Sequence, residues 1–507
     1  MVSATGDIAR VVFATCGVAR YNGGFMIIFF TKVPVLGFGK SRLRGFLSDA
    51  QVLNVCRMLI KDNFDVVKHF DFQICYAGLY DDLEFLNTDL LNISHYPQVE
   101  GDLGLRMKSA IFDALNSNDK VILIGSDIVG VDEDLIRSMY DALDDADIAI
   151  APAIDGGYGM IGMRKACDVF TGIEYSTPNV LDDTIKLAKS QNFSVKTTDA
   201  ILDIDEFDDL VRAETGVYDI KLIGRGEYNV NYLVDGKVFR INFASQMGLG
   251  SDQIEYEFNA LNELKNSGVT PIAFDCKRSG KYIPFGFLTM EYLKGRALDY
   301  DSDLKIAARL LSTIHNQSTD GSKLIKADRP FRMMYDEFLS MYAVYKNWDG
   351  RDLKTESIID ELMEIAGGYD LDAPMKRASI INTELNNRNF IIGEKSYVID
   401  WEKPIIGDCE QDLAHFMVPT TTNWKTDKIL SDSEIEGFLT EYEKYRPVDR
   451  ELLKQFMMFN TLRGVTWCSM AMVEYSSDRA IRNEDTFEKI KKFLSVEFLN
   501  MLKERFY

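Results

Sequence analysis

The hydrophobic pattern of the chain changes character near residue 211, and this change constrains the fold more than any other feature. Between residues 25 and 210, short β-rich apolar runs alternate with helical stretches, and an acidic segment, DIDEFDDLVRAETG, ends the pattern. At Tyr218 a new β pattern with glycine turns begins, and helical, aromatic-rich sequence follows it to the end. Because 507 residues exceed one ordinary hydrophobic core, the sequence predicts two consecutive domains of different fold class.

We place the domain boundaries where these patterns change. The expected parts are a weakly ordered extension at 1–24, an α/β domain at 25–211, a linker at 212–217 and a second domain at 218–507. The extension lacks the layout of a secretory signal. Met26, at the beginning of the first expected strand, is an alternative translation start.

The composition disfavours several classes of function. A net charge of −22 and a pI of about 4.7 give a surface that repels phosphate backbones and anionic lipids, which argues against nucleic-acid binding. No apolar run reaches membrane-spanning length, so we expect no stable membrane insertion. The seven Cys residues show no paired spacing and only four His residues are present. This usage favours a reducing, cytoplasmic location over a disulfide or structural-zinc framework.

The first domain is predicted to be an α/β sandwich with a ligand site at one edge of its sheet. The runs MIIFF, FQICYA, KVILIGSD and DIAIAPA are typical of strands buried in a parallel sheet. Open sheets of this kind bind ligands beyond the carboxyl ends of their strands. The loop after the first strand carries Lys32, Lys40 and Arg42, three cations that suit a triphosphate, although a solvated basic loop is the alternative. This loop is not a P-loop, because Pro34 stands where that motif needs a glycine.

Carboxylates at later strand ends support a phosphate site. Asp127 follows a strand and would hold Mg²⁺ between substrate phosphates. Asp155 precedes two glycines that allow close approach of a ligand, and Asp203 and Asp205 add further oxygen ligands. Each of these residues alone is more often a helix cap or a turn residue, so the prediction rests on their combination.

These elements together resemble the nucleotide-diphospho-sugar transferase (glycosyltransferase-A) fold, and within it small nucleotidyltransferases that couple a phosphorylated compound to a nucleotide. The matching motifs span residues 26–211 and are TKVPVLGFGKSRL, GDLGLRM, GSDIVG, DGGYGMIG, STPNVLDDT and DID. The resemblance implies a Rossmann-like α/β/α domain that acts on a nucleoside triphosphate, without selecting the base. The implied residues are Lys40 and Arg42 for catalysis, Lys32 and Gly37 for the nucleotide, Asp127, Asp203 and Asp205 for the metal, and Asp155, Gly156, Gly157 and Tyr158 for the acceptor.

The second domain begins with a glycine turn followed by a strand cation and a helix carboxylate. The turn contains Gly224 and Gly226, with Asn229 where a third glycine would stand, and by itself it would be a plain hairpin. The cation is Arg240 and the carboxylate is Glu257. In kinases such a pair positions the α- and β-phosphates of ATP. The segment Met290-Glu291-Tyr292 follows as a hinge against which an adenine would lie.

An E-x-x-x-x-N loop and a strand ending in Asp complete this order of parts. They place Glu384, Asn389 and Asp400 in one site. The carboxylate of Glu384 would orient a hydroxyl group or receive its proton, and Asn389 and Asp400 would be ligands of Mg²⁺. Residues 218–507 resemble the choline kinase and aminoglycoside phosphotransferase family. That resemblance implies a bilobal protein-kinase-like α+β fold with lobes at 218–294 and 295–507.

The loop departs from the family pattern, His-x-Asp with Asn five residues on, at two positions. Asn382 replaces the His and Glu384 replaces the Asp. The extra methylene moves the carboxylate by roughly one ångström, a displacement that can cost about a hundredfold in rate. Because Asn389 and Asp400 are retained, we favour an active enzyme over a pseudokinase.

The acceptor of this second domain is expected to be a small alcohol. A quaternary ammonium such as choline needs aromatic walls, for which Trp424, Trp467 and Tyr475 are candidates, although each one singly is equally typical of helix packing. Glu402, two residues after Asp400, is also predicted to contact the substrate.

The two halves together predict a bifunctional transferase. The second domain would phosphorylate a choline-like amino alcohol or a polyol with ATP, and the first would couple the product to a second nucleoside triphosphate, with CTP favoured, releasing pyrophosphate. Mg²⁺ would serve both domains. The alternatives are a glycosyltransferase fused to a small-molecule kinase, and a transferase regulated by a pseudokinase domain.

Overall fold

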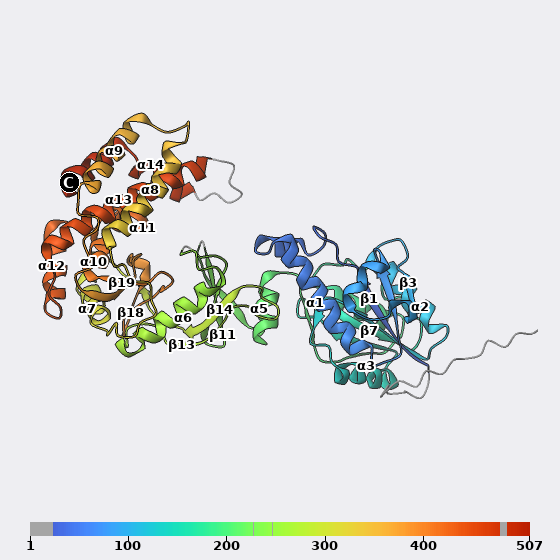
Figure 1. Ribbon diagram of the computed structural model, residues 1–507. Helices are drawn as coiled ribbons and strands as arrows, with labels where there is room; N and C mark the ends of the chain where they lie inside the picture. The colour runs from blue at the N-terminus through green and yellow to red at the C-terminus, as the bar shows by residue number, and fades with distance from the viewer. Residues whose placement is uncertain (1–23, 227, 246, 477–483) are drawn as a thin grey trace, which may run out of the picture. The chain divides into compact units, whose positions relative to one another are not determined.

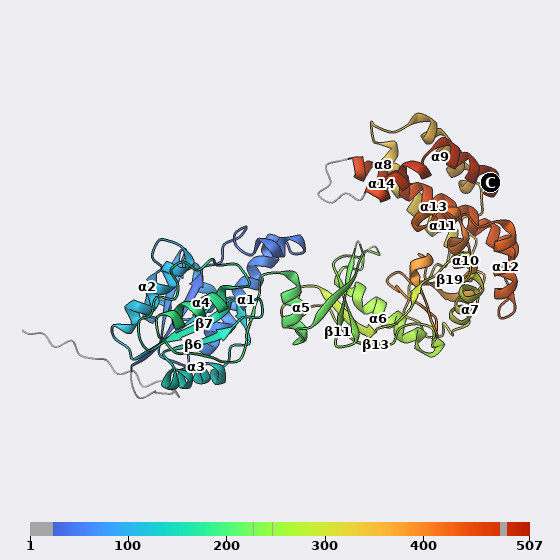
Figure 2. The same ribbon diagram turned by 180° about the vertical axis from the view of Figure 1, so that it is seen from behind.

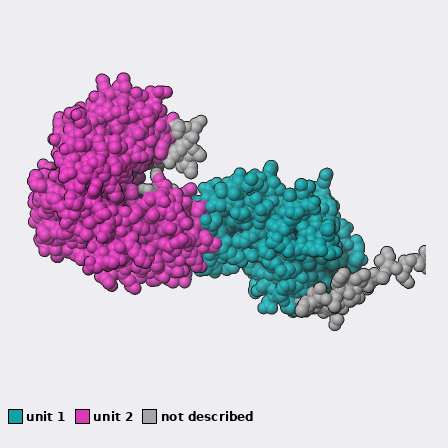
Figure 3. Space-filling model, viewed as in Figure 1, with its two compact units in different colours: residues 1–218, 281–284 teal, residues 219–280, 285–507 magenta. Residues whose placement is uncertain are grey.

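The computed structural model describes residues 24–226, 228–245, 247–476 and 484–507. The chain divides into two compact units, one comprising Met1–Tyr218 with Lys281–Pro284 and the other Asp219–Gly280 with Phe285–Tyr507 (Figure 3). All but the last residue of the expected extension, 1–23, lie outside the described residues. Each unit has its own hydrophobic core.

The first unit contains a seven-stranded sheet in the order β3-β2-β1-β4-β7-β6-β8. Strands β1, β2, β3 and β4 pair in parallel, as the continuous apolar runs predict. Strand β7, which was not among the predicted strands, pairs antiparallel with both β4 and β6. Gly159 and Gly162 allow close packing in this strand, since a Cβ on Gly159 would lie 2.6 Å from Ile201. The strands are β1 (Phe25–Lys32), β2 (Phe72–Ala77), β3 (His95–Pro97), β4 (Lys120–Gly125), β6 (Ile148–Pro152), β7 (Tyr158–Met163) and β8 (Val195–Thr197).

Helices cover both faces of this sheet, which gives the predicted α/β/α layering (Figures 1 and 2). Helices α1 (Asp49–Val67) and α3 (Glu133–Asp145) pack on one face, where Ile122 of β4 lies fully buried. Helices α2 (Leu103–Leu115) and α4 (Val180–Ser190) pack on the other face, with Leu123 of the same strand. Successive residues of β4 thus point into two different cores.

Short elements complete the first unit around the strand ends. Strand β5 (Ile128–Val129) pairs with β9 (Leu202–Asp203), next to the carboxyl end of β4. Helix α5 runs Phe207–Thr215, so residues 212–215 of the expected linker are helical. The remaining elements are the 3₁₀ helices η1 (Ser41–Gly45), η2 (Tyr80–Leu86) and η3 (Leu90–Asn92).

The second unit begins with a five-stranded antiparallel sheet in the order β10-β11-β12-β14-β13. The turn between β10 and β11 includes Gly226, and the register places Arg240 of β12 opposite Leu288 of β14. The elements are β10 (Ile220–Arg225), β11 (Asn229–Val234), β12 (Lys237–Asn242), η4 (Gly250–Asp252), α6 (Gln253–Leu264), η5 (Lys265–Ser267), β13 (Ala273–Lys277) and β14 (Gly286–Glu291).

The rest of this unit is mainly helical and is built round the long helix α13, which packs against α8 and α10. Trp401 is fully buried in this core. The helices are α7 (Leu304–His315), α8 (Pro330–Lys346), α9 (Leu353–Gly367), α10 (Cys409–Met417), α11 (Pro419–Lys425), α12 (Asp432–Glu443), α13 (Arg450–Ser476), α14 (Glu484–Phe493) and α15 (Val496–Phe506). The short strands and 3₁₀ helix are β15 (Arg296–Ala297), β16 (Ala378–Ile381), η6 (Asn387–Asn389), β17 (Phe390–Ile392), β18 (Tyr397–Val398) and β19 (Ile405–Asp408).

The predicted fold class is confirmed: an α/β/α domain precedes a bilobal domain with a β-rich and a helical lobe. No helix among the described residues is long and apolar enough to cross a membrane.

Replacing Ile122 by Ala should destabilise the first unit by about 2 to 5 kcal/mol, because a fully buried side chain leaves a cavity between β4 and its covering helices. Urea unfolding of the full chain measures the change. Leu91→Ala is the control, since Leu91 is 90% exposed. Equal unfolding curves for the Ile122 variant and the unmodified protein would contradict this assignment of the core.

Candidate functional site

In the first unit, the side chain of Lys40 lies between three carboxylates. Its Nζ atom is 2.7 Å from Asp127, 3.2 Å from Asp205 and 3.7 Å from Asp203. Lys40 precedes η1 with a left-handed backbone (φ 41°), and the three Asp residues follow or end strands β4 and β9. The structure therefore brings together four residues that the sequence placed in one site.

The charges of this cluster are strongly coupled. Burial alone would lower the pKa of Lys40, but Asp127 and its neighbours raise it well above the ordinary value, so the ammonium stays charged. Burial, followed by the charge of Asp127, raises the pKa of Asp203 to about 7. Its Oδ1 atom is buried and has no hydrogen-bond partner among the described residues.

The donor set of this cluster fits Mg²⁺, whose preferred ligands are carboxylate oxygens. The buried Oδ1 atom of Asp203 supports the fit, because it accepts no hydrogen bond among the described residues and has only the ion pair with Lys40 at 3.7 Å. Among the described residues, no three His, Cys, Asp or Glu side chains form a preformed metal centre. Since Lys40 lies between the carboxylates, it would have to move before Asp127, Asp203 and Asp205 could share an ion.

The other predicted residues of the first unit lie around this cluster without joining it. Arg42 forms an exposed ion pair with Glu206 at 3.4 Å, and Lys32 ends β1 with an exposed side chain. Gly37 adopts a left-handed backbone (φ 79°) in the loop between them. Asp155 accepts a hydrogen bond from the backbone N–H of Gly157 at 2.9 Å.

The acceptor segment of the first unit is tightly packed. Gly156 has φ 92°, and a Cβ there would lie 2.2 Å from the carbonyl oxygen of Pro178, so only glycine fits. The phenol of Tyr158 is buried beside that of Tyr175. Burial raises the pKa of Tyr158 well above its ordinary value.

In the second unit, the buried carboxylate of Asp412 fixes the loop that carries Glu384. It accepts hydrogen bonds from the backbone N–H groups of Asn382 and Thr383, both at 2.7 Å. The side-chain amide of Asn382 donates to the backbone oxygen of Asp400 at 2.8 Å. Asn382, the residue at the position of the family's His, therefore connects the loop to the segment that follows β18.

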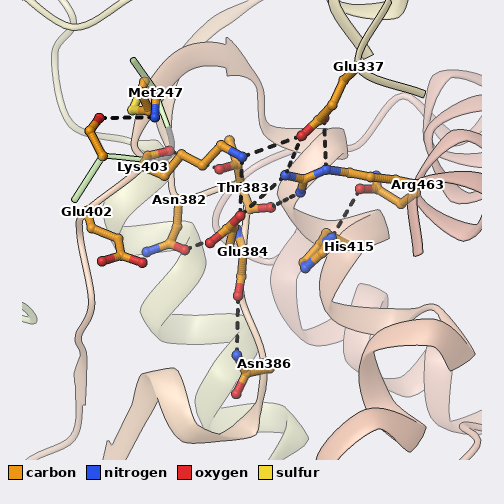
Figure 4. Close-up of polar contacts among 12 residues, drawn as sticks. Met247, Glu337, Asn382, Thr383, Glu384, Asn386, Glu402, Lys403, His415 and Arg463 are labelled. Carbon is orange, nitrogen blue, oxygen red and sulfur yellow. Dashed lines mark hydrogen bonds and ion pairs between the residues drawn. The ribbon is translucent and has the colours of Figure 1, made fainter. Parts of the chain in front are cut away.

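Glu384 lies within a ring of four charges (Figure 4). Lys403 and Arg463 each approach its Oε1 atom at 3.3 Å. The same two cations contact Glu337, at 3.5 Å from Lys403 and 3.1 Å from Arg463. Burial alone would raise the pKa of Glu384, but Lys403 and Arg463 lower it below its ordinary value. The carboxylate is therefore ionised at neutral pH.

Arg240 connects the β-rich lobe of the second unit to Asp400. It lies 3.0 Å from Glu257, 2.7 Å from Asp400 and 3.1 Å from Glu402. The side-chain amide of Asn229 also donates to Glu402. Burial and the charge of Asp400 raise the pKa of Glu402 to about 8.

Three cavities meet around these residues and share parts of their walls. The first, of about 360 Å³, lies under the glycine turn and includes Gly226, Arg240 and Asp400 in its lining. The second, of about 60 Å³, contains Asn389, Asp400 and Glu384. The third, of about 290 Å³, shares Glu384 with the second and extends between α8, α11 and α13. Asn389 and Asp400 supply oxygen ligands that fit Mg²⁺ between the first and third cavities.

Several predicted residues do not line these cavities. Gly224 lies within β10, and Met290 and Glu291 lie within β14, where Met290 pairs with Val238. Tyr292 follows that strand and is 38% exposed.

The expectation that Tyr475 lines the acceptor cavity is wrong. Its ring stacks on Phe487 at 5.7 Å in the core, whereas Trp424 and Trp467 do line the cavity. Tyr475 lies eight positions after Trp467, which places it roughly 12 Å farther along the same helix.

The sequence did not single out four residues that define the acceptor cavity, namely Glu337, Lys403, His415 and Arg463. Lys403 directly follows the predicted Glu402, so its position was a usable signal. Glu337 and Arg463 lie on α8 and α13, 126 residues apart. Only tertiary packing brings them together.

Comparison with protein-family models assigns both units. Residues 64–177 match a family described as "Uncharacterized protein conserved in bacteria (DUF2064)". Residues 219–452 match the "Phosphotransferase enzyme family". The chain joins a DUF2064 domain to a phosphotransferase-family domain. Both resemblances stated from the sequence are confirmed at the level of these family matches, and the phosphotransferase match identifies the protein as a transferase.

Three solved structures that are similar to this chain each cover only part of it. A protein of Desulfovibrio desulfuricans G20 assigned as a nucleotide-diphospho-sugar transferase is 31% identical, with 38% of this chain and 87% of that chain covered and a TM-score of 0.36. A choline/ethanolamine kinase family protein from Mesorhizobium loti is 14% identical (58% and 98% covered, TM-score 0.42). A choline kinase from Streptococcus pneumoniae is 19% identical (57% and 98% covered, TM-score 0.40). Among curated proteins, none matches the chain.

Replacing Lys40 by Met should make the first unit more dependent on divalent cations. Loss of the ammonium leaves three neighbouring carboxylates without their counter-charge, so the melting temperature should fall in EDTA. Mg²⁺ should then raise it by more than it raises that of the unmodified protein. Differential scanning fluorimetry measures both shifts.

Lys61→Met is the matched control, because Lys61 pairs with Asp65 on the exposed surface of α1. An equal Mg²⁺ shift in the Lys40 variant, the control and the unmodified protein would contradict the assignment of this cluster as a cation site.

Proposed function

We propose that the protein is a bifunctional enzyme that phosphorylates a small alcohol with ATP and then couples the product to a second nucleoside triphosphate, with CTP favoured. The products would be a nucleotide-activated headgroup and pyrophosphate. The observation that carries this proposal is the position of Glu384, whose carboxylate lines both the acceptor cavity and the small cavity of Asn389 and Asp400. A hydroxyl in the first cavity would therefore face a phosphoryl group held at the second.

In the first step, Arg240, bonded to Glu257, would hold the phosphates of ATP under the glycine turn. Asn389 and Asp400 would hold Mg²⁺, which neutralises charge on the transferring phosphoryl group when bound. The acceptor oxygen forms a bond to the γ-phosphorus, the bond to the β-phosphate oxygen breaks, and the hydroxyl proton passes to a base.

Glu384 would orient the hydroxyl and receive its proton late in this step. The contacts from Lys403 and Arg463 keep its carboxylate ionised but make it a weak base. A weak base suffices, since phosphoryl transfer passes through a loose transition state that needs little deprotonation of the nucleophile. The same two cations restrain the longer Glu side chain, which supports an active enzyme rather than a pseudokinase.

In the second step, an oxygen of the new phosphomonoester would attack the α-phosphorus of the second triphosphate, and pyrophosphate would leave. Lys40 and Arg42 would contact the triphosphate, while Asp127, Asp203 and Asp205 would hold Mg²⁺. Residues 155–158 would face the acceptor. The support for this step is the convergence of Lys40 with the three carboxylates.

Glu384→Gln should lower phosphorylation about a hundredfold or more, since the variant keeps the shape but loses the proton acceptor. Asp127→Asn should leave phosphorylation unchanged and abolish nucleotidyl transfer. The measurement is mass spectrometry of products from ATP, Mg²⁺, each second triphosphate and a panel of amino alcohols and polyols.

Glu394→Gln and Asp141→Asn, both at exposed positions, are the matched controls and should retain both activities. Slow ATP hydrolysis alone, across the whole panel, would refute the coupled reaction. Transfer of a sugar from a nucleotide-sugar, without pyrophosphate release from any triphosphate, would instead identify the first unit as a glycosyltransferase.

A further inference from the structure

The acceptor cavity contains a histidine ring with one nitrogen available to a ligand. His415 of α10 lines this cavity together with Glu384 and Asn386. Its Nδ1 atom lies 3.2 Å from Oδ1 of Asn460. Among the described residues, its Nε2 atom has no hydrogen-bond partner.

The hydrogen bonds of Asn460 fix which nitrogen of His415 carries the proton. The side-chain amide of Asn460 donates to the backbone oxygens of Gln411 at 3.2 Å and Phe456 at 3.0 Å. Its Oδ1 atom must therefore accept, and Nδ1 of His415 must donate. In the neutral ring, Nε2 then carries a lone pair and can only accept a hydrogen bond.

The ring is neutral at physiological pH. Burial, with a contribution from the charge of Arg463, lowers the pKa of His415 to about 4. The ionised groups that share the cavity, Glu337, Glu384, Lys403 and Arg463, already balance one another in the four-charge ring. Among the described residues, the polar atom of the cavity wall that these charges leave without a partner is Nε2 of His415, a hydrogen-bond acceptor.

A second polar atom of the same wall also lacks a partner. The hydroxyl of Thr420 is buried without a hydrogen bond among the described residues, and Thr420 lines the cavity. Gly464 of α13 packs against it, since a Cβ there would lie 2.5 Å from Thr420 Cβ. The protein itself covers this hydroxyl, so a ligand in the cavity does not reach it.

The aromatic residues of the cavity are poorly arranged to surround a quaternary ammonium. Trp424 and Trp467 meet edge to face, with centroids 5.3 Å apart and an interplanar angle of 86°. The ammonium of Lys425 lies 5.5 Å from the centroid of Trp424 and so competes with a ligand cation for that ring. Tyr475, the third aromatic candidate, stacks on Phe487 instead.

We propose that Nε2 of His415 accepts a hydrogen bond from a second polar group of the acceptor, so that the enzyme selects alcohols carrying another O–H or N–H over quaternary ammonium alcohols. This inference rests on the proposed phosphorylation of an alcohol in this cavity. The acceptor class is then a polyol or an amino alcohol with at least one N–H.

The test compares acceptors in which methyl groups replace the hydrogens of this donor, namely ethanolamine against choline and ethylene glycol against 2-methoxyethanol. With the unmodified protein, kcat/KM for phosphorylation should be at least about tenfold higher for the donor-bearing member of each pair, the worth of one well-placed hydrogen bond. This comparison of kcat/KM uses only the unmodified protein, so it does not depend on whether a variant folds.

Two variants separate the ligand contact from a structural role. His415→Asn keeps a donor for Asn460 but places no acceptor at the Nε2 position, so KM for ethanolamine should rise about tenfold while kcat changes less. His415→Gln returns an amide oxygen near that position and should recover part of the loss. KM for choline should be the same in all three proteins.

Different outcomes overturn different claims. If choline and 2-methoxyethanol are phosphorylated as well as their partners, and His415→Asn leaves KM unchanged, this inference fails while the proposed function stands. If the unmodified protein phosphorylates no alcohol of the panel, the proposed function fails and the inference fails with it.

Discussion

The candidate kinase site depends on one buried carboxylate, that of Asp412. It is fully buried and accepts hydrogen bonds from two consecutive backbone N–H groups, those of Asn382 and Thr383. Thr383 has a left-handed backbone (φ 73°), a conformation that costs free energy in a β-branched residue and persists only where its surroundings hold it. The position of Glu384 follows directly from this restraint, and with it the geometry of the cavity that receives the acceptor.

Both units use the same electrostatic arrangement in their candidate sites. In the first unit the ammonium of Lys40 contacts three Asp carboxyl groups, and in the second the guanidinium of Arg240 contacts Glu257, Asp400 and Glu402. Neighbouring carboxylates repel one another strongly when partly buried, so each cluster needs a cation to persist without ligand. A metal–nucleotide complex offers positive and negative charge together, and would therefore satisfy the carboxylates and the protein cation at the same time.

Local sequence patterns predicted most of the fold, whereas contacts between distant segments defined the parts of the site that were missed. Strand β4 was predictable because its residues are apolar on both faces. The kinase-like site was predictable because its residues follow one another along the chain in a recognisable order, namely Arg240, Glu257, Glu384, Asn389 and Asp400. Strand β7 was not, because its glycines resemble a loop and its pairing with β4 and β6 is non-local. The four-charge ring could not be predicted either, because Glu337 and Arg463 come from two helices whose packing no local motif encodes.

Helix α13 supplies Asn460, Arg463, Gly464, Trp467 and Cys468 to the acceptor cavity, while its other residues pack against α8 and α10. The same helix therefore contributes both to acceptor specificity and to the hydrophobic core of this domain. A substitution that widens the cavity also loosens helix packing, so new acceptor preferences should evolve slowly from this face.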